Sequence, residues 1–177
     1  MRYLFLFILC ILSGTRLYSQ KINSAYKLHI TETKLPIVID GFIDEEAWNV
    51  RDSAANFFMV SPMDTSYAKV RTTVRMTYDQ HNLYISAICY EPKPNTNYAV
   101  ESLRRDFAYT KNDNFLLIVD PFDDQTNGFT FGVNAAGAQW DGLIFNSNGY
   151  DLSWDNKWYS EVKHYADRWV FEAAIPF

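Results

Sequence analysis

The chain has 177 residues, of which 48% are hydrophobic and 17% aromatic. A composition this rich in apolar side chains can form a packed core, which excludes a globally disordered chain. Two of the 16 basic residues fall among the first 20 positions, so residues 21–177 carry 14 basic and 21 acidic side chains and a formal charge of −7. That balance argues against nucleic-acid binding, because contact with a phosphate backbone needs clustered Lys and Arg.

Residues 1–20 have the pattern of a secretory signal peptide. Arg2 precedes a ten-residue apolar run at residues 3–12, and small residues follow at Ser13 and Gly14. A basic start, a short apolar centre and a small-residue exit are typical of such a leader, whereas a membrane span needs about 20 apolar residues. The sequence therefore predicts an exported protein whose mature part, residues 21–177, is one domain that does not span a membrane. The alternative, a buried N-terminal helix, fits the pattern less well.

Cysteine usage leaves no intramolecular disulfide in the predicted mature domain. Cys10 is removed with the leader, and Cys89 stands alone in the apolar run at residues 83–91. An exported domain of this kind must be held together by packing. Cys89 is interpreted as a small buried hydrophobic residue in preference to a reactive thiol.

The first predicted element in chain order is a short helix at residues 44–49, with three acidic residues at its N-terminal end and Trp48 as its anchor. A period of two then dominates. Residues 70–78 alternate apolar and polar, which predicts a strand with one face in solvent. Residues 83–90 are apolar on both faces and predict an interior strand, paired with the first across a short polar turn.

Five further strands are predicted, at residues 115–119, 129–133, 139–145, 158–165 and 169–175. Short strands joined by turn residues, without a sustained helical stripe, indicate an all-β fold. We therefore expect an antiparallel β-sandwich of jelly-roll or immunoglobulin-like architecture with one short helix. The chain stops at Phe177, directly after an apolar strand, which indicates a fragment that lacks its last strand.

No sequence motif indicates catalysis. His29, His81 and His164 are scattered, and the serine-hydrolase, zinc-protease and phosphate-loop motifs are absent from the sequence. The carboxylates are interpreted as solvated turn residues. One loop, with Asp120, Asp123 and Asp124, is oxygen-rich enough to suggest Ca²⁺ as a cofactor, although the spacing is not that of an EF-hand.

Aromatic residues in polar stretches suggest a different chemistry. Trp140, Trp154 and Trp158 lie in loop-rich segments, and sugar-binding sites stack a flat aromatic ring on the apolar face of a pyranose. One exposed Trp could therefore bind a saccharide. The alternative is that the tryptophans close the ends of the sandwich, which is the better interpretation for Trp158.

The motifs in the chain resemble those of family 9 carbohydrate-binding modules and their relatives. Residues 39–48, which read Ile-Asp-Gly-Phe-Ile-Asp-Glu-Glu-Ala-Trp, are similar to the opening of that family. Similar later blocks follow in the same order at Tyr78-Asp79, residues 83–85, residues 113–121, residues 129–137 and residues 169–177. The resemblance covers roughly residue 37 to the end, and it implies a β-sandwich that binds carbohydrate.

A subgroup of this family, placed at the N-terminus of large Gram-negative envelope proteins, is more similar still. The matching residues are Arg104-Arg105-Asp106, residues 123–128, residues 134–137, and Ser153-Trp154-Asp155 with Trp158. In such proteins an outer-membrane barrel region follows the module. The resemblance therefore implies a location in the periplasm, at the outer membrane or outside the cell, and a C-terminal remainder of a longer protein as partner.

The family's sugar-binding residues are largely not retained in this sequence. The aromatic before the strand at 115–119 corresponds to Thr110, with Tyr109 adjacent; the family's glutamate corresponds to Leu116 and its arginine to Gly132. A second aromatic would lie beyond Phe177. A different site remains a candidate, built from Arg104, Arg105 and Asp106 with Trp140 or Trp154.

The leading functional hypothesis is a non-catalytic carbohydrate-binding module of a secreted or envelope protein involved in polysaccharide binding or breakdown. Its ligand would be a polysaccharide or oligosaccharide. The first alternative is a structural accessory domain of an outer-membrane barrel protein that has lost sugar binding. The second alternative is part of a glycoside hydrolase acting on O-glycosyl bonds. Its only basis is that such modules occur together with enzymes of that kind.

Overall fold

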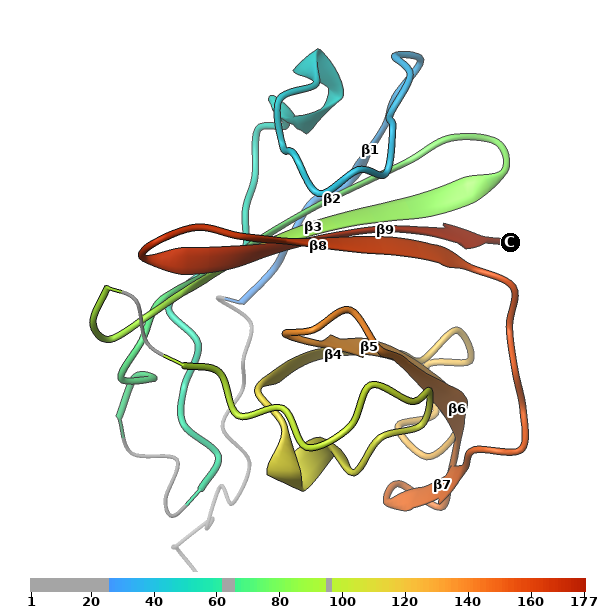
Figure 1. Ribbon diagram of the computed structural model, residues 1–177. Helices are drawn as coiled ribbons and strands as arrows, with labels where there is room; N and C mark the ends of the chain where they lie inside the picture. Colours follow the sequence, from blue (N-terminus) through green and yellow to red (C-terminus); the bar gives the residue numbers. More distant parts are fainter. Residues whose placement is uncertain (1–25, 62–65, 95–96) are drawn as a thin grey trace, which may run out of the picture.

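The computed structural model describes residues 26–61, 66–94 and 97–177, and the predicted signal peptide lies outside these residues. Two β-sheets pack face to face (Figure 1). The first sheet has the order β1-β2-β3-β9-β8, with strands Thr31–Glu32, Thr72–Tyr78, Asn82–Tyr90, Arg168–Pro176 and Tyr159–His164 respectively. The second has the order β4-β5-β6-β7, with strands Asn114–Val119, Gly128–Asn134, Gln139–Phe145 and Gly149–Asp151. The predicted all-β sandwich is confirmed.

Strand pairing in the first sheet places the last described strand near its centre. β2 and β3 form the predicted antiparallel hairpin, with Thr72 opposite Cys89 and Tyr78 opposite Leu83. β9 then pairs with β3 on one side and with β8 on the other. The pairing of β1 with β2 is parallel, unlike the antiparallel pairing expected throughout.

The main core lies between the two sheets and is formed by inward-facing residues of both. Ile85, Val133 and Phe171 are among its fully buried members. Cys89 packs against this cluster, and burial raises the pKa of its thiol to about 12. The interpretation of Cys89 as a small hydrophobic residue agrees with this position.

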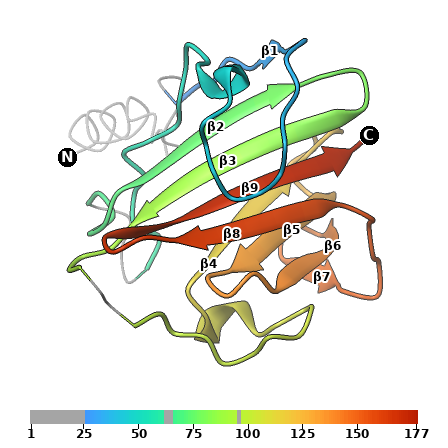
Figure 2. The ribbon, with the colours of Figure 1, turned by 45° about the horizontal axis from the view of Figure 1, so that its top comes forward.

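Both sheets are also covered on their outer faces. The loop at residues 36–49 crosses the first sheet (Figure 2), and Trp48 of the 3-10 helix η1 (Glu46–Trp48) packs there with Tyr84 and Ala174. The segment at residues 97–113, which contains the 3-10 helix η2 (Tyr109–Lys111), covers the second sheet. Its Phe107 packs on Trp140.

Several local predictions need correction. The helix expected at residues 44–49 is a 3-10 turn of three residues, and η2 was not predicted, so the described residues hold two short helices. β1 and β7 were not predicted, because strands of two and three residues carry almost no periodic signal. The outer face of β2 is not uniformly in solvent, since Thr77 is buried and donates a hydrogen bond to the carbonyl of Thr31.

Within the three described stretches of the chain, no helix has the length and apolarity needed to cross a membrane.

Candidate functional site

The three candidate tryptophans are placed mainly in the interior. Trp140 and Trp158 are only 1% and 5% exposed, and Trp154 is half-buried. Trp154 and Trp158 both pack against Phe131, with ring centroids 6.0 and 5.6 Å from it. Trp154 also borders an apolar cavity of about 310 Å³ at the end of the sandwich. The interpretation as plugs of the sandwich fits the positions of Trp154 and Trp158, whereas Trp140 packs in a separate cluster with Phe107.

Arg105 is engaged in contacts within the protein. Its guanidinium donates hydrogen bonds to Oε1 of Gln139 (2.7 Å), Oδ1 of Asp155 (2.9 Å) and the carbonyl of Asn156 (3.0 Å). It also forms an ion pair with Asp141, which is completely buried. These contacts hold the segment around Asp155 against β6.

The two neighbours of Arg105 differ from each other in exposure, since Asp106 is half-buried. Arg104 is exposed at the surface. Asp106 adopts a left-handed backbone with φ of 59°, and burial raises the pKa of its carboxyl. Its backbone N–H donates to the carbonyl of Gln139. Through Arg105 and Asp106, the Arg104-Arg105-Asp106 motif therefore connects its segment of the chain to β6.

The acidic loop at residues 120–127 is stabilised by its own carboxylates. Asp120 accepts hydrogen bonds from the N–H groups of Phe122, Asp124 and Gln125. Asp124 accepts three more, from the N–H groups of Thr126 and Asn127 and from the Asn127 side chain, which hold its pKa well below the usual range.

The third acidic residue of this loop, Asp123, is exposed and has a left-handed backbone. Among the residues whose positions are described, no three His, Cys, Asp or Glu side chains are grouped as metal ligands. Asp120 and Asp124 therefore stabilise the turns of this loop.

The positions that the resemblance aligns with sugar ligands form an apolar contact on the outer face of the second sheet. Leu116 of β4 lies directly opposite Gly132 of β5. Leu116 fills the space above that glycine, since a Cβ at Gly132 would lie 2.2 Å from its Cδ2 atom. Leu116 also packs in the cluster formed by Phe107 and Trp140. No polar ligand set is present at this pair.

Two exposed tyrosines stand beside this contact. The rings of Tyr109 and Tyr150 meet the buried indole of Trp140 in edge-to-face contacts, with centroids 5.7 and 5.5 Å from it. The two tyrosine centroids are 6.1 Å apart, and the residues are 39% and 40% exposed. Trp140 therefore forms a fixed base that presents two aromatic rings to solvent. We call Tyr109 and Tyr150 the tyrosine pair.

A small groove continues from the tyrosine pair. It has a volume of about 130 Å³ and is bordered by Tyr150, Ile118, Ile144 and polar residues of two loops. The polar residues that line it are Asp120, Gln125, Thr126, Asn127 and Ser147. The arrangement joins exposed aromatic rings to hydrogen-bonding side chains, which suits a ligand with an apolar face and hydroxyl groups.

Sequence reasoning found only part of this arrangement. Tyr109 had a signal, since it adjoins Thr110 at the family's aromatic position, and Trp140 was singled out as a candidate. Tyr150 was not singled out, because only tryptophans were considered among the aromatic residues in polar stretches and the strand Gly149–Asp151 was not expected.

No protein-family model and no curated protein sequence matches this chain. Solved structures share its fold. A family 9 carbohydrate-binding module from Caldicellulosiruptor kristjanssonii in complex with glucose is 18% identical, with a TM-score of 0.58, over 84% of this chain and 68% of that one. The structure of a family 9 module from the same organism with cellotriose is 17% identical, with a TM-score of 0.58, over 85% of this chain and 67% of the other. The chain therefore has a fold like that of the family 9 modules.

Proposed function

We propose that this chain is a non-catalytic carbohydrate-binding domain in which a saccharide ring stacks on the tyrosine pair. The observation that carries the proposal is the exposure of Tyr109 and Tyr150 over a buried Trp140, beside a groove lined by polar loops. The structures of similar fold contain glucose and cellotriose, which supports a glucose-based oligosaccharide as the ligand.

The geometry explains how such a site would work. A tyrosine ring offers a flat, rigid surface with few rotatable bonds, so little conformational entropy is lost on stacking. Trp140 holds both rings from below. The groove beyond Tyr150 carries amide, hydroxyl and carboxylate groups that can bond to sugar hydroxyls. Affinity is modest in this arrangement, because a shallow, hydrated site must offset ordering and desolvation.

We further propose that the domain acts in an exported protein of the Gram-negative envelope, in polysaccharide binding or breakdown. The support is the signal-peptide pattern of residues 1–20 and the motifs at residues 104–106, 123–128 and 153–158. In this proposal the domain brings the remainder of a longer protein close to its glycan.

A structural role without sugar binding is the second candidate function, and two observations favour it. Leu116 covers Gly132 where the family carries polar ligands, and Trp140 and Trp158 are buried. In that case the domain would cover or position a neighbouring domain, and the tyrosine pair would be part of a protein interface.

A glycoside hydrolase role has less geometric support. Such enzymes place two carboxyl groups about 5–10 Å apart on opposite sides of the scissile bond, and one of them has a raised pKa. Glu32 and Asp79 line one cavity of about 420 Å³. Asp79, however, accepts hydrogen bonds from the N–H groups of His81 and Asn82 and from the Tyr84 hydroxyl, which lower its pKa. A lowered pKa is the opposite of what a general acid needs.

The test is a titration with cello-, xylo- and manno-trioses, followed by tryptophan fluorescence and calorimetry. Tyr109→Ala and Tyr150→Ala should each weaken binding at least tenfold, because each removes one stacking surface. Tyr159→Ala is the matched control, since Tyr159 is 69% exposed on β8 and belongs to neither the tyrosine pair nor its groove. A flat response of the unmodified chain to all three sugars would favour the structural role. Release of shorter sugars from the trioses would support the glycoside hydrolase role.

A further inference from the structure

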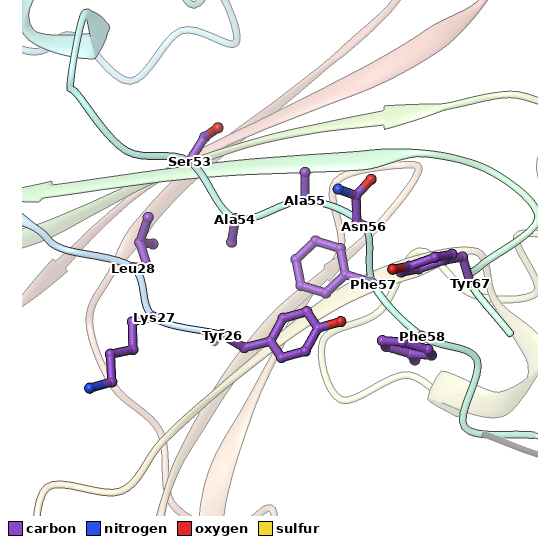
Figure 3. A pocket seen from close by; sticks show the side chains of 10 residues that line it. All are labelled: Tyr26, Lys27, Leu28, Ser53, Ala54, Ala55, Asn56, Phe57, Phe58 and Tyr67. Atoms are coloured by element: carbon purple, nitrogen blue, oxygen red, sulfur yellow. The ribbon is translucent and has the colours of Figure 1, made fainter. Parts of the chain in front are cut away.

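A second aromatic cavity lies at a different place on the molecule. It has a volume of about 630 Å³ and is formed between the segment that starts at Tyr26 and residues 53–58, which precede β2. Four aromatic side chains line it, namely Tyr26, Phe57, Phe58 and Tyr67 (Figure 3). They are 52%, 41%, 40% and 59% exposed, so a large aromatic surface faces solvent at one place. We call this space the Tyr67 cavity.

The backbone around the Tyr67 cavity is held by hydrogen bonds. Phe58 and Tyr67 are bridge partners, supported by Met59 N–H to the Ser66 carbonyl (2.9 Å) and Ala68 N–H to the Phe57 carbonyl (2.7 Å). Ala54 exchanges two further bonds with Val74 of β2. These bonds tie the wall that carries Phe57, Phe58 and Tyr67 to the first sheet.

The rings are arranged around the space in more than one orientation. Phe58 and Tyr67 form a tilted ring pair, with centroids 4.6 Å apart and planes inclined by 31°. Tyr26 meets Phe58 edge-on at 5.9 Å and 76°. The hydroxyl groups of Tyr26 and Tyr67 point toward one another, and the Phe57 ring lies beside them (Figure 3). A flat ring can therefore contact aromatic faces and phenol hydroxyls together.

Polar groups at the border of the cavity decide the class of ligand. Asn56, Ser53 and Lys27 are among the ten lining residues, none of which is acidic, and the Lys27 side chain extends away from the four rings (Figure 3). A purely apolar ligand would displace water from the Asn56 amide and the tyrosine hydroxyls without replacing its hydrogen bonds, which costs free energy. Asn56 also has a left-handed backbone, with φ of 57°, next to Phe57. A ring with an apolar face and hydroxyl groups satisfies both parts of this lining.

We propose that the Tyr67 cavity is a second saccharide-binding site, separate from the tyrosine pair, which takes one or two neutral pyranose units. This proposal rests on the proposed function, because it assumes that the domain binds carbohydrate. It adds a second site, formed by other parts of the fold. The tyrosine pair lies on η2 and β7, whereas the Tyr67 cavity is attached to β2. Two sites of modest affinity on one domain bind a long polysaccharide by avidity, since the second contact becomes intramolecular.

The experiment is an NMR titration of the chain with ring-labelled tyrosine and phenylalanine, using cello-, xylo- and manno-trioses as probes. At least one sugar should shift the ring signals of Tyr26, Phe57 and Tyr67 in a saturable way. Tyr67→Ala should weaken binding at these signals at least tenfold. Tyr67→Phe keeps the stacking ring and removes the hydroxyl, so it should weaken binding only a few-fold. Tyr159→Ala should leave both sets of signals as in the unmodified chain.

The outcomes separate the two proposals. Shifts at Tyr109 and Tyr150 with none at Tyr26 and Tyr67 would overturn the second site and leave the proposed function in place. Shifts at Tyr26 and Tyr67 alone would support the Tyr67 cavity and overturn the tyrosine pair as a site. No shifts at either place would overturn both. If Tyr67→Ala fails to fold, Tyr67→Phe and Phe57→Leu decide the same question, and undiminished binding in both would overturn the inference.

Discussion

The indole Nε1 of Trp48 donates a hydrogen bond of 2.8 Å to Oε1 of Glu172, which lies 124 residues later in the chain. The other carboxylate oxygen of Glu172 accepts hydrogen bonds from the N–H groups of Gly41 (2.9 Å) and Asp40 (3.2 Å). Glu172 is completely buried on the outer face of β9. A single carboxyl group therefore fastens the loop at residues 36–49 to the first sheet.

Glu172 should make stability depend on pH. Removal from water raises its pKa from 4.5 to about 7, although its three hydrogen-bond donors favour the ionised form. The pKa of Glu172 is higher in the folded than in the unfolded protein, so the proton on Glu172 stabilises the folded state. This contribution to the free energy of unfolding is complete below about pH 4.5 and is lost as pH rises through about 7. We expect the Glu172 contribution to the free energy of unfolding to fall by about 3 kcal/mol between pH 4 and pH 8. Urea unfolding across this range measures it.

The control for this prediction is Glu172→Gln, which has no titrating group at the position. The difference between the two unfolding curves isolates Glu172 from residues such as Asp79, whose lowered pKa acts in the opposite direction. If the two proteins show the same change in stability from pH 4 to pH 8, Glu172 is ionised in both the folded and unfolded states at neutral pH.

Loss of Arg105 should destabilise the fold much more than loss of its neighbour. Arg105→Ala leaves the buried carboxylate of Asp141 without its counter-charge and frees the Asp155 segment. Removing one partner of a buried ion pair costs several kcal/mol, and because Arg105 is partly exposed we expect about 2–4 kcal/mol. The measurement is the urea midpoint, with Arg104→Ala as control, since Arg104 is exposed. Equal midpoints for the two variants would contradict the prediction.

A methyl group at position 132 should be poorly tolerated. In Gly132→Ala the new Cβ would lie 2.2 Å from Cδ2 of Leu116 and 2.9 Å from the carbonyl oxygen of Phe115. Overpacking of this kind costs about 1–3 kcal/mol. In the background of Leu116→Ala the side-chain clash is gone and only the backbone contact remains, so the same substitution should cost less. A double-mutant cycle of melting temperatures measures this coupling, and strict additivity would show that Leu116 moves aside freely.

The thiol of Cys89 should be nearly inert in the folded protein. Burial raises its pKa to about 12, so the reactive thiolate is scarce at pH 8. Relative to an exposed cysteine we expect alkylation to be about a thousandfold slower. Iodoacetamide labelling read by peptide mapping follows Cys89 alone, with the protein in denaturant as the fast reference. Equal labelling rates with and without denaturant would show that the site opens readily.

The strands were predictable wherever a run of five or more residues alternated or was apolar on both faces. Residues 83–90, 139–145 and 169–175 all lie within strands of the structure. β1 escaped prediction because its two residues depend on a parallel partner, β2, far along the chain. The helix at residues 44–49 was predicted too long, since the stability of this turn comes from the contacts of Trp48.

The candidate site was less predictable because exposure is a property of tertiary packing. The sequence marks Trp140 as an aromatic in a polar region, and only the packing of Phe107 and Leu116 beside it shows that it is buried. The exposed rings belong to Tyr109 and Tyr150, which lie 41 positions apart and meet only over Trp140. Arg105 looked available as a ligand, yet its donors are directed at Asp155, Gln139 and Asn156, contacts that span 34 to 51 residues.

The place of β9 within its sheet also has a consequence for folding during synthesis. β9 is the last of the described strands in chain order, and it lies between β3 and β8. Until a ribosome has made residues 168–176, β8 has no partner in the first sheet and one edge of β3 is unpaired. Contacts between residues so far apart in sequence form slowly. One edge of β3 and the whole of β8 therefore stay open until β9 is in place, and Glu172 of β9 then fastens the loop at residues 36–49.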